Sequence, residues 1–429
     1  MAEVRAVYKQ KGSKTDPNNY RPISVLPLEK LVATQLYEYC DKHNVLPLEQ
    51  FGFRRHSSCE MALFAATDSW IKSVDRGSYA GALLVDLSKA FATVPHQLLL
   101  TELRDIGCSI EVLLWFCNYL TDRLQRVITY EEITDWIMVS RGFPQGSGLS
   151  PLLFSIFVRN LPRLCSSPIF QFADDTTVVA EDPSLSVVAD KLKSAFDDVK
   201  QFCDSHELKI NLEKTQLILF KKPGKPIPED FHIILENCTV TPQKTVKLLG
   251  VTLDQHLTFG PHIENVANRC QGLLGILAKA TPYLPKELLK LMYTALIRSH
   301  MEYCSSIFSS AAKTHLKKLD VIQRKAARII YEVPRDAHAD LLLLFLKLDA
   351  LNDRRELEKS ILSTLSNHLS QVNVIQLCHH WWKHARTKLH VSQSNTVLGK
   401  RRPSVFGANL YNQQLALSSD SEDTDTQSS

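Results

Sequence analysis

The stretch Phe170-Gln171-Phe172-Ala173-Asp174-Asp175-Thr176-Thr177-Val178-Val179 places two adjacent carboxylates between two short apolar runs. Runs in which polar and apolar residues alternate predict the two arms of a tight β-hairpin. An Asp pair in a turn is commonly a solvated loop, because Asp favours turns. Here the flanks are too apolar for the surface, and they supply no Gly or Asn for an ordinary two-residue turn. The pattern therefore favours two acids held in place by a buried sheet.

A third carboxylate, Asp86, follows the apolar run Gly81-Ala82-Leu83-Leu84-Val85 and precedes a helical pattern. This is typical of a buried strand that carries an acid at its end. Asp also caps helices, so Asp86 alone would be weak support for a site. Together with Asp174 and Asp175 it predicts a cluster of three carboxylates. Carboxylates forced together repel one another, and oxygen-ligated Mg²⁺ is the usual ion that neutralises them.

The composition is that of an ordinary globular protein, with 429 residues of which 44% are hydrophobic and 22% are charged. No apolar run reaches the roughly 18 residues that span a bilayer, and the start of the chain lacks a signal-peptide core. We therefore expect an intracellular protein without a membrane partner, and the sequence leaves nucleus and cytoplasm open. Ten cysteines without a Cys-x-x-Cys pair argue against a zinc ribbon and against a secreted disulfide framework.

The net charge of +4 conceals an uneven distribution. Residues 265–335 hold twelve Lys and Arg against four Asp and Glu, a net charge of +8. Within this segment, apolar residues recur at helical spacing from Leu316 to Ile329, which predicts a helix with one packed face. A charged helix face is usually only solvated, and the alternative is a face that binds a phosphate backbone. The basic residues beside the apolar stripe are Lys317, Lys318, Arg324, Lys325 and Arg328.

Between the acid-bearing stretches, the pattern predicts helices over 96–106 and 110–120. The second is apolar on most sides, so we expect it to be buried. Two hairpin arms, 125–129 and 136–140, lead into a glycine-rich loop, Gly142-Phe143-Pro144-Gln145-Gly146-Ser147-Gly148. Glycines let such a loop approach a nucleotide closely. After the Asp pair, residues 184–203 predict an amphipathic helix that covers a sheet.

Three segments, in this order, resemble motifs A, B and C of a reverse transcriptase: Val85-Asp86-Leu87-Ser88-Lys89-Ala90-Phe91, Phe143-Pro144-Gln145-Gly146-Ser147 and Phe172-Ala173-Asp174-Asp175. The family is that of the LINE-type, non-LTR retrotransposon polymerases, in a jockey-like variant. Residues 208–220 resemble motif D, and residues 247–253 resemble the primer-grip hairpin. The likeness implies an α+β, right-hand polymerase with fingers, a palm built on an antiparallel sheet, and a helical thumb.

The resemblance also divides the chain. We expect N-terminally truncated fingers at 1–80, a palm with motifs A to E and inserted helices at 81–257, and a helical thumb and connection at 258–370. A basic and aromatic segment would follow at 371–418, and a disordered acidic tail at 419–429. Because the chain begins inside the fingers, we expect the endonuclease that this family carries upstream to be missing. The cluster Cys378, His379 and His380 lacks zinc-finger spacing, which favours an aromatic-basic contact surface over a zinc site.

The resemblance implies an RNA-directed DNA polymerase that adds deoxynucleoside triphosphates to the 3′-hydroxyl of a DNA primer on an RNA template. Two Mg²⁺ ions, with Mn²⁺ as the alternative, would be held mainly by Asp86 and Asp174 and more weakly by Asp175. Lys214 would protonate the leaving pyrophosphate, and Lys209 competes for that role.

The resemblance assigns the remaining substrate contacts to residues near the acids. Phe91 would be the steric gate that excludes a 2′-hydroxyl, or a core residue, or both. Gln145 and Gly146 would contact the incoming nucleotide, and Arg54 would hold the triphosphate or the template. The basic helix at 316–329 would grip the duplex through its phosphates.

Four positions depart from the family pattern. Ala92 stands where the family usually has Asp, and Phe172 where it usually has Tyr. Gly148 and Ser150 replace the usual Val and Gly of motif B. We expect weakened rather than abolished chemistry, because neither Ala92 nor Phe172 replaces a principal metal ligand. The alternative is a decayed or domesticated copy that binds nucleic acid without polymerising.

Overall fold

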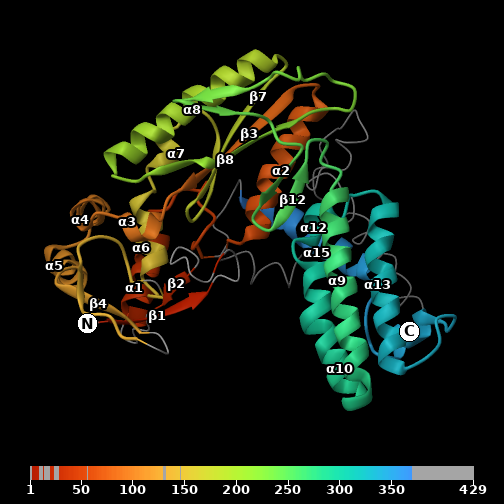
Figure 1. Ribbon diagram of the computed structural model, residues 1–429. Coiled ribbons are helices and arrows are strands. Elements are labelled where there is room, and N and C mark those ends of the chain that lie inside the picture. The colour runs from red at the N-terminus through yellow and green to blue at the C-terminus, as the bar shows by residue number, and fades with distance from the viewer. Residues whose placement is uncertain are drawn as a thin grey trace, which may run out of the picture.

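An antiparallel sheet lies at the centre of the computed structural model, which describes residues 2–8, 13, 20–23, 29–55, 57–128, 132–144 and 146–369. Its strands are β3 (Tyr79–Leu87), β6 (Ile169–Phe172), β7 (Asp175–Asp182) and β8 (Ile210–Phe220). They are arranged in the order β6-β7-β3-β8, and all three pairings are antiparallel. Figure 1 shows this sheet in the upper half of the molecule. The predicted hairpin is the pair β6 and β7, and the strand predicted before Asp86 is β3.

The two faces of the sheet are covered by two separate cores, because successive side chains of a strand point to opposite faces. On β3, Ala80 and Ala82 join a core that includes the helix α2 (Cys59–Asp75). Leu83 and Val85 join the second core, on the other face. All four residues are at most 2% exposed, so β3 is buried on both sides, as its continuous apolar run predicts.

The helix predicted over 184–203 is α8 (Leu185–Ser205), which covers the second face of the sheet. Its residues Val188 and Leu192 are fully buried. They lie so close to β3 that a Cβ added at Gly81 would come within 2.8 Å of both side chains. Close packing of helix on strand therefore fixes the position of β3, the strand that leads to Asp86.

The N-terminal part of the molecule contains a second four-stranded sheet and several short helices (Figure 1). The sheet has the order β2-β1-β4-β5, with β1 at Ala2–Tyr8, β2 at Tyr20–Ile23, β4 at Arg123–Ile128 and β5 at Ile137–Val139. The helices are α1 (Glu29–Lys42), α3 (Ala90–Thr93), α4 (His96–Asp105), α5 (Ile110–Leu120), α6 (Ser150–Phe157) and α7 (Leu161–Leu164). The hairpin predicted before the glycine-rich loop is confirmed as β4 and β5, which pair antiparallel.

The expectation that the helix at 110–120 is buried was wrong. Only Phe116 and Leu120 of α5 are buried, whereas Ile110 is 72% and Leu114 is 60% exposed. The helix packs against α4 along one edge. An apolar composition does not distinguish a helix enclosed on all sides from one whose outer face is left uncovered by the described part of the chain.

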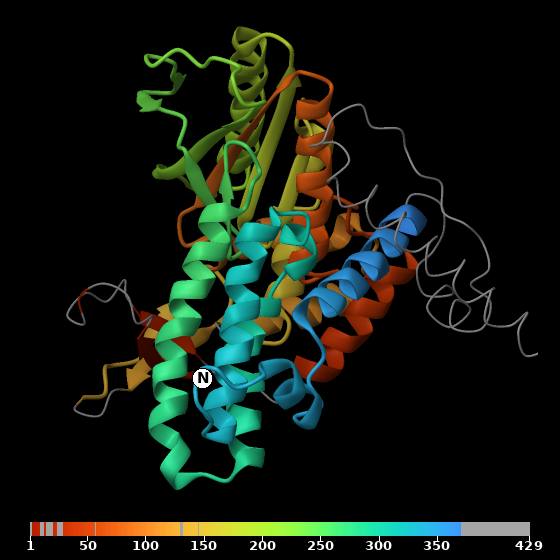
Figure 2. The same cartoon turned by 90° about the vertical axis from the view of Figure 1, so that its right-hand side faces the viewer.

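The chain continues through two small hairpins into a helical lobe. The hairpins are β9 (Ile233–Leu235) with β10 (Cys238–Val240), and β11 (Thr245–Leu248) with β12 (Val251–Asp254). The lobe consists of α9 (Gly260–Ala280), η2 (Thr281–Tyr283), α10 (Lys286–Met292), η3 (Tyr293–Arg298), α11 (Ser299–Glu302), α12 (Ser305–Phe308), α13 (Lys313–Tyr331), α14 (Ala339–Phe345) and α15 (Leu351–Leu369). Figures 1 and 2 show α9 and α13 side by side, extending away from the central sheet.

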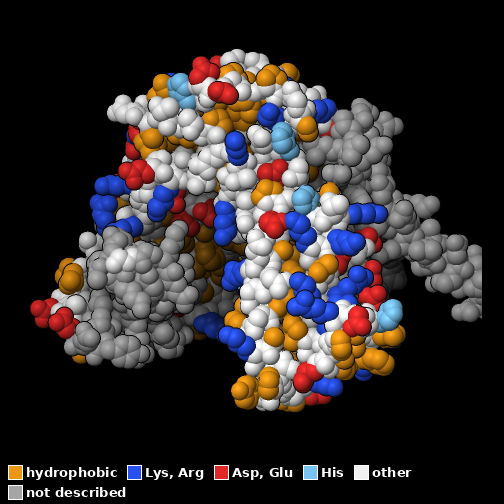
Figure 3. Space-filling model, turned by 45° about the vertical axis from the view of Figure 1, so that its right-hand side comes forward, with side chains coloured by type: hydrophobic (Ala, Val, Ile, Leu, Met, Phe, Trp, Pro, Cys, Tyr) orange, Lys and Arg blue, Asp and Glu red, His pale blue; other side chains and the backbone are white. Residues whose placement is uncertain are grey.

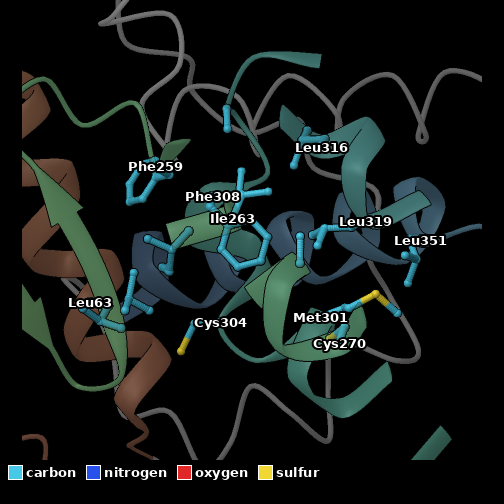
Figure 4. Close-up of a cluster of buried hydrophobic side chains, with 14 of the residues drawn as sticks. Leu63, Phe259, Ile263, Cys270, Met301, Cys304, Phe308, Leu316, Leu319 and Leu351 are labelled. Carbon is cyan, nitrogen blue, oxygen red and sulfur yellow. The ribbon is translucent and has the colours of Figure 1, made fainter. Parts of the chain in front are cut away.

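The first core runs without a break from α2 into the helical lobe. Figure 4 shows Leu63 of α2 beside Cys304, with Ile263 of α9 and Phe308 of α12 in the same cluster. Leu63, Ile263 and Phe308 are fully buried. The lobe is therefore fixed to one face of the central sheet through α2.

The predicted fold class is confirmed: the protein is α+β, with an antiparallel sheet and a helical lobe in the place of a thumb. None of the described helices is long and apolar enough to cross a membrane. The boundaries of fingers, palm and thumb stay predictions. The segments 371–418 and 419–429, with the cluster Cys378, His379 and His380, lie outside the described residues.

Candidate active site

Two acids lie at the tip of the hairpin, where β6 passes into β7. Phe172 pairs with Asp175, so the turn between them consists of Ala173 and Asp174 alone. Ala173 has a φ of 59°, a left-handed conformation. That conformation costs an L-residue roughly 1–2 kcal/mol. Neighbouring structure must therefore hold the turn, as the lack of Gly or Asn predicted.

Residues 49–53 supply this support by pairing with β6. The Phe51 N–H donates to the Gln171 carbonyl (2.8 Å), and the Gln171 N–H donates to the Glu49 carbonyl (2.9 Å). The chain then passes over the turn so closely that a Cβ added at Gly52 would lie 2.2 Å from the backbone nitrogen of Ala173. Only glycine fits at this position without a shift of the hairpin.

The sequence prediction missed this supporting role. It singled out Arg54 in the same segment, whereas Gly52 and the fully buried Gln50 are the residues that contact the hairpin and its surroundings. The Gln50 side-chain amide donates to Ser155 Oγ of α6 (3.1 Å). The available signal was a single glycine between two aromatic residues, Phe51 and Phe53.

Strand β3 brings Asp86 to the same edge of the sheet. Its register with β7 pairs Val85 with Thr176, which places Asp86 beside Asp175, one residue further along. On its other side Asp86 pairs with Asn211 of β8, after an irregularity in the pairing. The three predicted acids therefore share one end of the sheet, although they are far apart in the sequence.

The three carboxylates are partly withdrawn from water, and their negative charges repel one another. Burial raises the pKa of Asp174 above its ordinary value, against a backbone hydrogen bond that lowers it, and the Asp86 charge adds to the rise. Burial also raises the pKa of Asp175 to about 6, and the charges of Asp174 and Asp86 contribute. Asp175 is classed as exposed when all its atoms are counted, but neighbouring protein atoms shield part of its carboxyl group from water. A cation at this edge would relieve the repulsion.

The cluster fits a divalent ion in charge and in donor type, but it does not form a closed cage. Within the described ranges, no group of three or more His, Cys, Asp or Glu side chains is arranged to hold a metal ion by itself. Mg²⁺ at nucleotide-processing sites is commonly held by one or two carboxylates together with phosphate oxygens of the substrate. An open set of mutually repelling carboxylates fits such an ion. The metal assignment to Asp86, Asp174 and Asp175 stays a prediction.

Of the two lysines considered as proton donors, Lys214 lies beside the acids. Its Nζ is 3.8 Å from Asp86 Oδ2. The Lys214 side chain is 70% exposed, so this ion pair is weak and the ammonium group can turn toward a ligand. Lys209 instead lines a different pocket, with Lys200 and Glu236. The structure therefore brings Lys214 to the acids, and its role as the proton donor stays a prediction.

Phe91 is half-buried in an aromatic cluster. It stacks on Phe154 of α6, with ring centroids 4.5 Å apart and an angle of 27° between the rings. Phe53 meets it edge-on at 6.2 Å. Both interpretations of Phe91 remain open, since one side of the ring packs and part of it reaches solvent.

The glycine-rich loop is fixed to the segment that follows β3. The Gly142 N–H donates to the Val94 carbonyl (2.8 Å), and the Phe143 N–H donates to the Phe91 carbonyl (3.0 Å). His96 Nε2 lies 2.9 Å from the Gly142 carbonyl. The exposed Gly146 has a φ of 98°, which favours glycine there. Gln145 lies outside the described residues, so its predicted nucleotide contact stays a prediction.

Arg54 lies in a pocket of about 430 Å³ together with Pro47, Glu49 and Arg163. Its Nη1 donates to the Pro47 carbonyl (2.9 Å). Burial lowers the pKa of Arg54, while the charges of Asp41 and Glu49 raise it. In the part of the chain that the structure describes, no interaction joins Arg54 to the three acids. The structure does not bring it to the cluster, and its predicted role in substrate binding stays a prediction.

The five basic residues predicted to bind nucleic acid lie on α13, but they do not form one uniform face. Lys318 pairs with Glu264, and Lys325 Nζ donates to Gln271 Oε1 (3.0 Å), so both turn toward α9. Two others make contacts with the chain that follows α13: Arg324 Nε donates to Asp340 Oδ1 (3.2 Å), and Arg328 Nε to the Ala337 carbonyl (2.9 Å). Lys317 is exposed, and the described residues supply no partner for it. Figure 3 shows Lys and Arg side chains gathered over this lobe.

With this geometry in view, comparison with known proteins gives a consistent answer. A sequence profile described as reverse transcriptase (RNA-dependent DNA polymerase) matches residues 9–253. A probable RNA-directed DNA polymerase from transposon BS of Drosophila melanogaster is 29% identical over 357 residues, which cover 78% of this chain and 38% of the relative. The RNA-directed DNA polymerase from mobile element jockey of the same organism is 26% identical over 365 residues, covering 79% and 39%.

The chain spans about two fifths of the length of the curated relatives it matches. Among solved structures, an apo telomerase from Candida tropicalis truncated from its C-terminal domain aligns with a TM-score of 0.42 and 12% identity. That alignment covers 60% of this chain and 54% of the telomerase. A likeness of this size permits no transfer of individual residues.

Proposed function

The chain belongs to the reverse transcriptase (RNA-dependent DNA polymerase) family, and on this basis we propose that it is an RNA-directed DNA polymerase. It would add deoxynucleotides from deoxynucleoside triphosphates to the 3′-hydroxyl of a DNA primer paired with an RNA template. The single observation that best supports this activity is the meeting of Asp86 with Asp174 and Asp175 at one end of the central sheet.

Nucleotide addition needs negatively charged oxygen ligands for divalent ions at the edge of the sheet where Asp86, Asp174 and Asp175 lie. A divalent ion pair, when bound, activates the primer hydroxyl and neutralises the charge of the leaving pyrophosphate. Asp86 and Asp174 are the principal oxygen donors in this proposal, with Asp175 beside them, and Mg²⁺ or Mn²⁺ suits such donors. Burial raises the pKa of Asp174 and Asp175, and the charges of the neighbouring acids add to the rise, which supports their role as cation ligands.

The other residues of the site would orient the substrate and supply a proton. Lys214, 3.8 Å from Asp86 and largely exposed, would deliver its proton to the pyrophosphate oxygen. Phe91 would pack against the sugar and exclude a 2′-hydroxyl. The loop containing Gly146 would lie along the incoming nucleotide, since its backbone leaves room for a close approach. Basic side chains of α13 would hold the phosphates of the duplex.

Primer extension on an RNA template tests the proposal. Asp174→Asn keeps the shape of the side chain and removes its charge, so extension should fall by at least about 100-fold, the equivalent of a few kcal/mol of lost metal binding. The matched control is Asp197→Asn on the outer surface of α8, which should extend at the wild-type rate. Equal extension by the wild type and Asp174→Asn would reject the polymerase assignment.

An intracellular place of action, in the nucleus or the cytoplasm, is part of the same proposal. Fractionation of cells that express the chain would test it, and recovery of the protein from the medium would contradict it.

A further inference from the structure

Glu29, a residue that the motifs do not assign, connects three parts of the fold at the glycine-rich loop. It is the first residue of α1 and is 4% exposed. Its Oε1 accepts the Tyr119 hydroxyl of α5 (2.5 Å), and its Oε2 accepts the Gly148 N–H of the loop (3.1 Å). A buried carboxylate needs such donors, because an unpaired charge is costly to bury.

The hydrogen bonds continue from Tyr119 into the loop in a consistent donor order. Since the phenol proton points to Glu29, the Ser147 hydroxyl donates to the Tyr119 oxygen (3.1 Å). Ser147 Oγ in turn accepts the N–H groups of Leu149 (3.1 Å) and Ser150 (3.2 Å), where α6 begins. Burial raises the pKa of Tyr119, and its hydrogen bond to Glu29 raises it further, so the phenol stays a donor. The loop is thus held at Ser147 and at Gly148.

The Tyr119 ring is itself fixed between two neighbours. It stacks on Trp115, with centroids 5.4 Å apart and an angle of 7° between the rings. The Arg123 guanidinium lies 5.0 Å from the ring centroid. Stacked aromatic and cation–π contacts restrict the ring, so the position of its hydroxyl is determined by α5 and β4. Figure 1 shows α1, α5 and α6 together in the lower left part of the molecule.

Local sequence does not fix this loop in place. Gly146 and Gly148 leave its backbone free, and a Cβ added at Gly148 would meet nothing within 4 Å. A loop with two glycines in three residues samples many conformations unless something external selects one. The hydrogen bonds of Glu29 and Ser147 supply that selection directly on the segment that includes Gly146.

We infer that Glu29, acting through Tyr119, Ser147 and the Gly148 N–H, is a positioning residue that sets the glycine-rich loop for the incoming nucleotide. The inference rests on the proposed polymerase function and deepens it. It concerns the affinity for the deoxynucleoside triphosphate, because Glu29 acts on the loop and not on the three acids. Binding of the primer and template is not affected in this view.

Steady-state addition of a single nucleotide tests the inference with two mild variants. Glu29→Gln keeps the shape but offers one acceptor in place of two, and Tyr119→Phe removes only the hydroxyl. Each should raise the KM for the deoxynucleoside triphosphate about tenfold, as expected for a lost hydrogen bond to a charged group, with kcat within about twofold. The double variant should be no worse than the more severe single one, because the two residues share a bond.

Matched controls separate positioning from a general loss of structure. Glu38→Gln changes an exposed residue of the same helix. Tyr39→Phe removes a hydroxyl that donates to the Ile106 carbonyl (2.7 Å), away from the loop. Both should keep the wild-type KM. An unchanged KM in Glu29→Gln and Tyr119→Phe, or a loss of kcat that follows a fall in melting temperature, would overturn the inference.

Hydrogen exchange at the Gly148 amide gives a second readout that needs no catalysis. Exchange should become at least about tenfold faster in Glu29→Met, which offers the Gly148 N–H no acceptor, and stay unchanged in Glu38→Met on the exposed side of the same helix. A wild-type protein that extends no primer would reject the proposed function, while the exchange result would still decide whether Glu29 holds the loop. Unchanged exchange in Glu29→Met would reject the inference alone.

Discussion

At the scale of single residues, the tightest steric constraint on the acid-bearing hairpin is Gly52. Its backbone lies against the Ala173 nitrogen, in a turn that already carries a left-handed alanine. The turn cannot retreat freely, because β6 and β7 are paired on both sides of it. The position of Asp174 and Asp175 therefore depends on a residue that has no side chain of its own.

Gly52→Ala should damage both activity and stability. The added methyl group would lie 2.2 Å from a backbone atom, so the hairpin or the supporting segment must move. We expect a loss of about 1–3 kcal/mol in the free energy of unfolding, as for overpacked sites, together with a clear loss of primer extension. Denaturant unfolding of the variant measures the first effect.

The matched control is Gly272→Ala on α9, where an added Cβ meets nothing within 4 Å. There the same substitution should stabilise the protein by up to about 1 kcal/mol, because alanine favours a helix. If Gly52→Ala were as stable as the wild type, the close approach of Gly52 to the hairpin would be refuted.

The departures from the family pattern differ in their structural consequences. Ser150 Oγ donates to the Pro144 carbonyl (2.9 Å) across the base of the glycine-rich loop, a bond that glycine could not make. At Gly148 a side chain would find open space. A Cβ added at Gly142 would lie 2.6 Å from backbone atoms of Ala92, so the loop passes close to the backbone at this position. Nothing in the structure explains Phe172 in place of tyrosine.

At the scale of elements, His262 joins the helical lobe to the hairpin of β11 and β12. It lies in the first turn of α9 and is 4% exposed. Its Nδ1 accepts the Thr252 N–H (3.3 Å), and its ring lies 5.1 Å from that of Phe308. Burial lowers the pKa of His262 to about 4, and the nearby charge of Lys247 acts in the same direction.

The lowered pKa of His262 predicts that the packing of α9 against the hairpin of β11 and β12 loses stability in acid. In the unfolded chain His262 takes up its proton near pH 6.5, whereas in the folded protein it resists protonation down to about pH 4. Its contribution to stability is therefore complete above pH 6.5 and is lost as the pH falls toward 4, by up to roughly 3 kcal/mol. Denaturant unfolding at pH 7.5, 5.5 and 4.5 measures this loss. His262→Asn keeps an acceptor and cannot titrate, so a pH dependence equal to that of the wild type would contradict the prediction.

The contacts of α13 divide its lysines into paired and free groups. Lys318 already has Glu264 as a partner, and Lys317 has none among the residues that the structure describes. A lysine that must leave an internal partner gains less from a phosphate. The five basic residues are therefore not equivalent in nucleic-acid binding.

Lys317→Ala should lower the salt dependence of duplex binding by about one phosphate contact, a change of about 0.9 in the slope of log K against log salt. Lys318→Ala should change the slope by less. Fluorescence anisotropy with a labelled RNA–DNA duplex at several salt concentrations measures both slopes. Equal slopes for the wild type and Lys317→Ala would remove Lys317 from the binding surface.

At the scale of the whole molecule, two hydrophobic cores pack against opposite faces of the central sheet. One core passes from α2 through the hairpin of β11 and β12 into the helical lobe, and the other lies under α8, α4 and α6. Since β3 contributes to both, the lobe and the acid-bearing edge are joined through packed side chains rather than through a flexible linker.

Phe308→Ala should therefore destabilise more than the lobe in which it lies. Phe308 is fully buried and shares a core with Leu63 and Trp70 of α2. Removing its ring should cost about 3–5 kcal/mol. Hydrogen exchange should show faster opening in α2 and β3 as well as in α12. Faster exchange confined to the helical lobe would show that the two parts unfold independently.

The sequence by itself determined the chemistry-bearing parts of this protein. The alternation around Asp174 and Asp175, the apolar run before Asp86 and the amphipathic pattern of α8 each depend on neighbours within one element, and the periodicity of a strand or helix exposes them directly. The order of the three motifs then indicated the family, which the match over residues 9–253 shows.

Only the tertiary structure decided what lies beside these parts. Gly52 against Ala173, Glu29 beneath the glycine-rich loop, the exposed outer face of α5 and the internal partners of the α13 lysines all depend on contacts between distant segments. Such contacts produce no periodic pattern in the sequence, because they join segments that are distant along the chain. Their steric fit and hydrogen-bond geometry exist only in the folded protein.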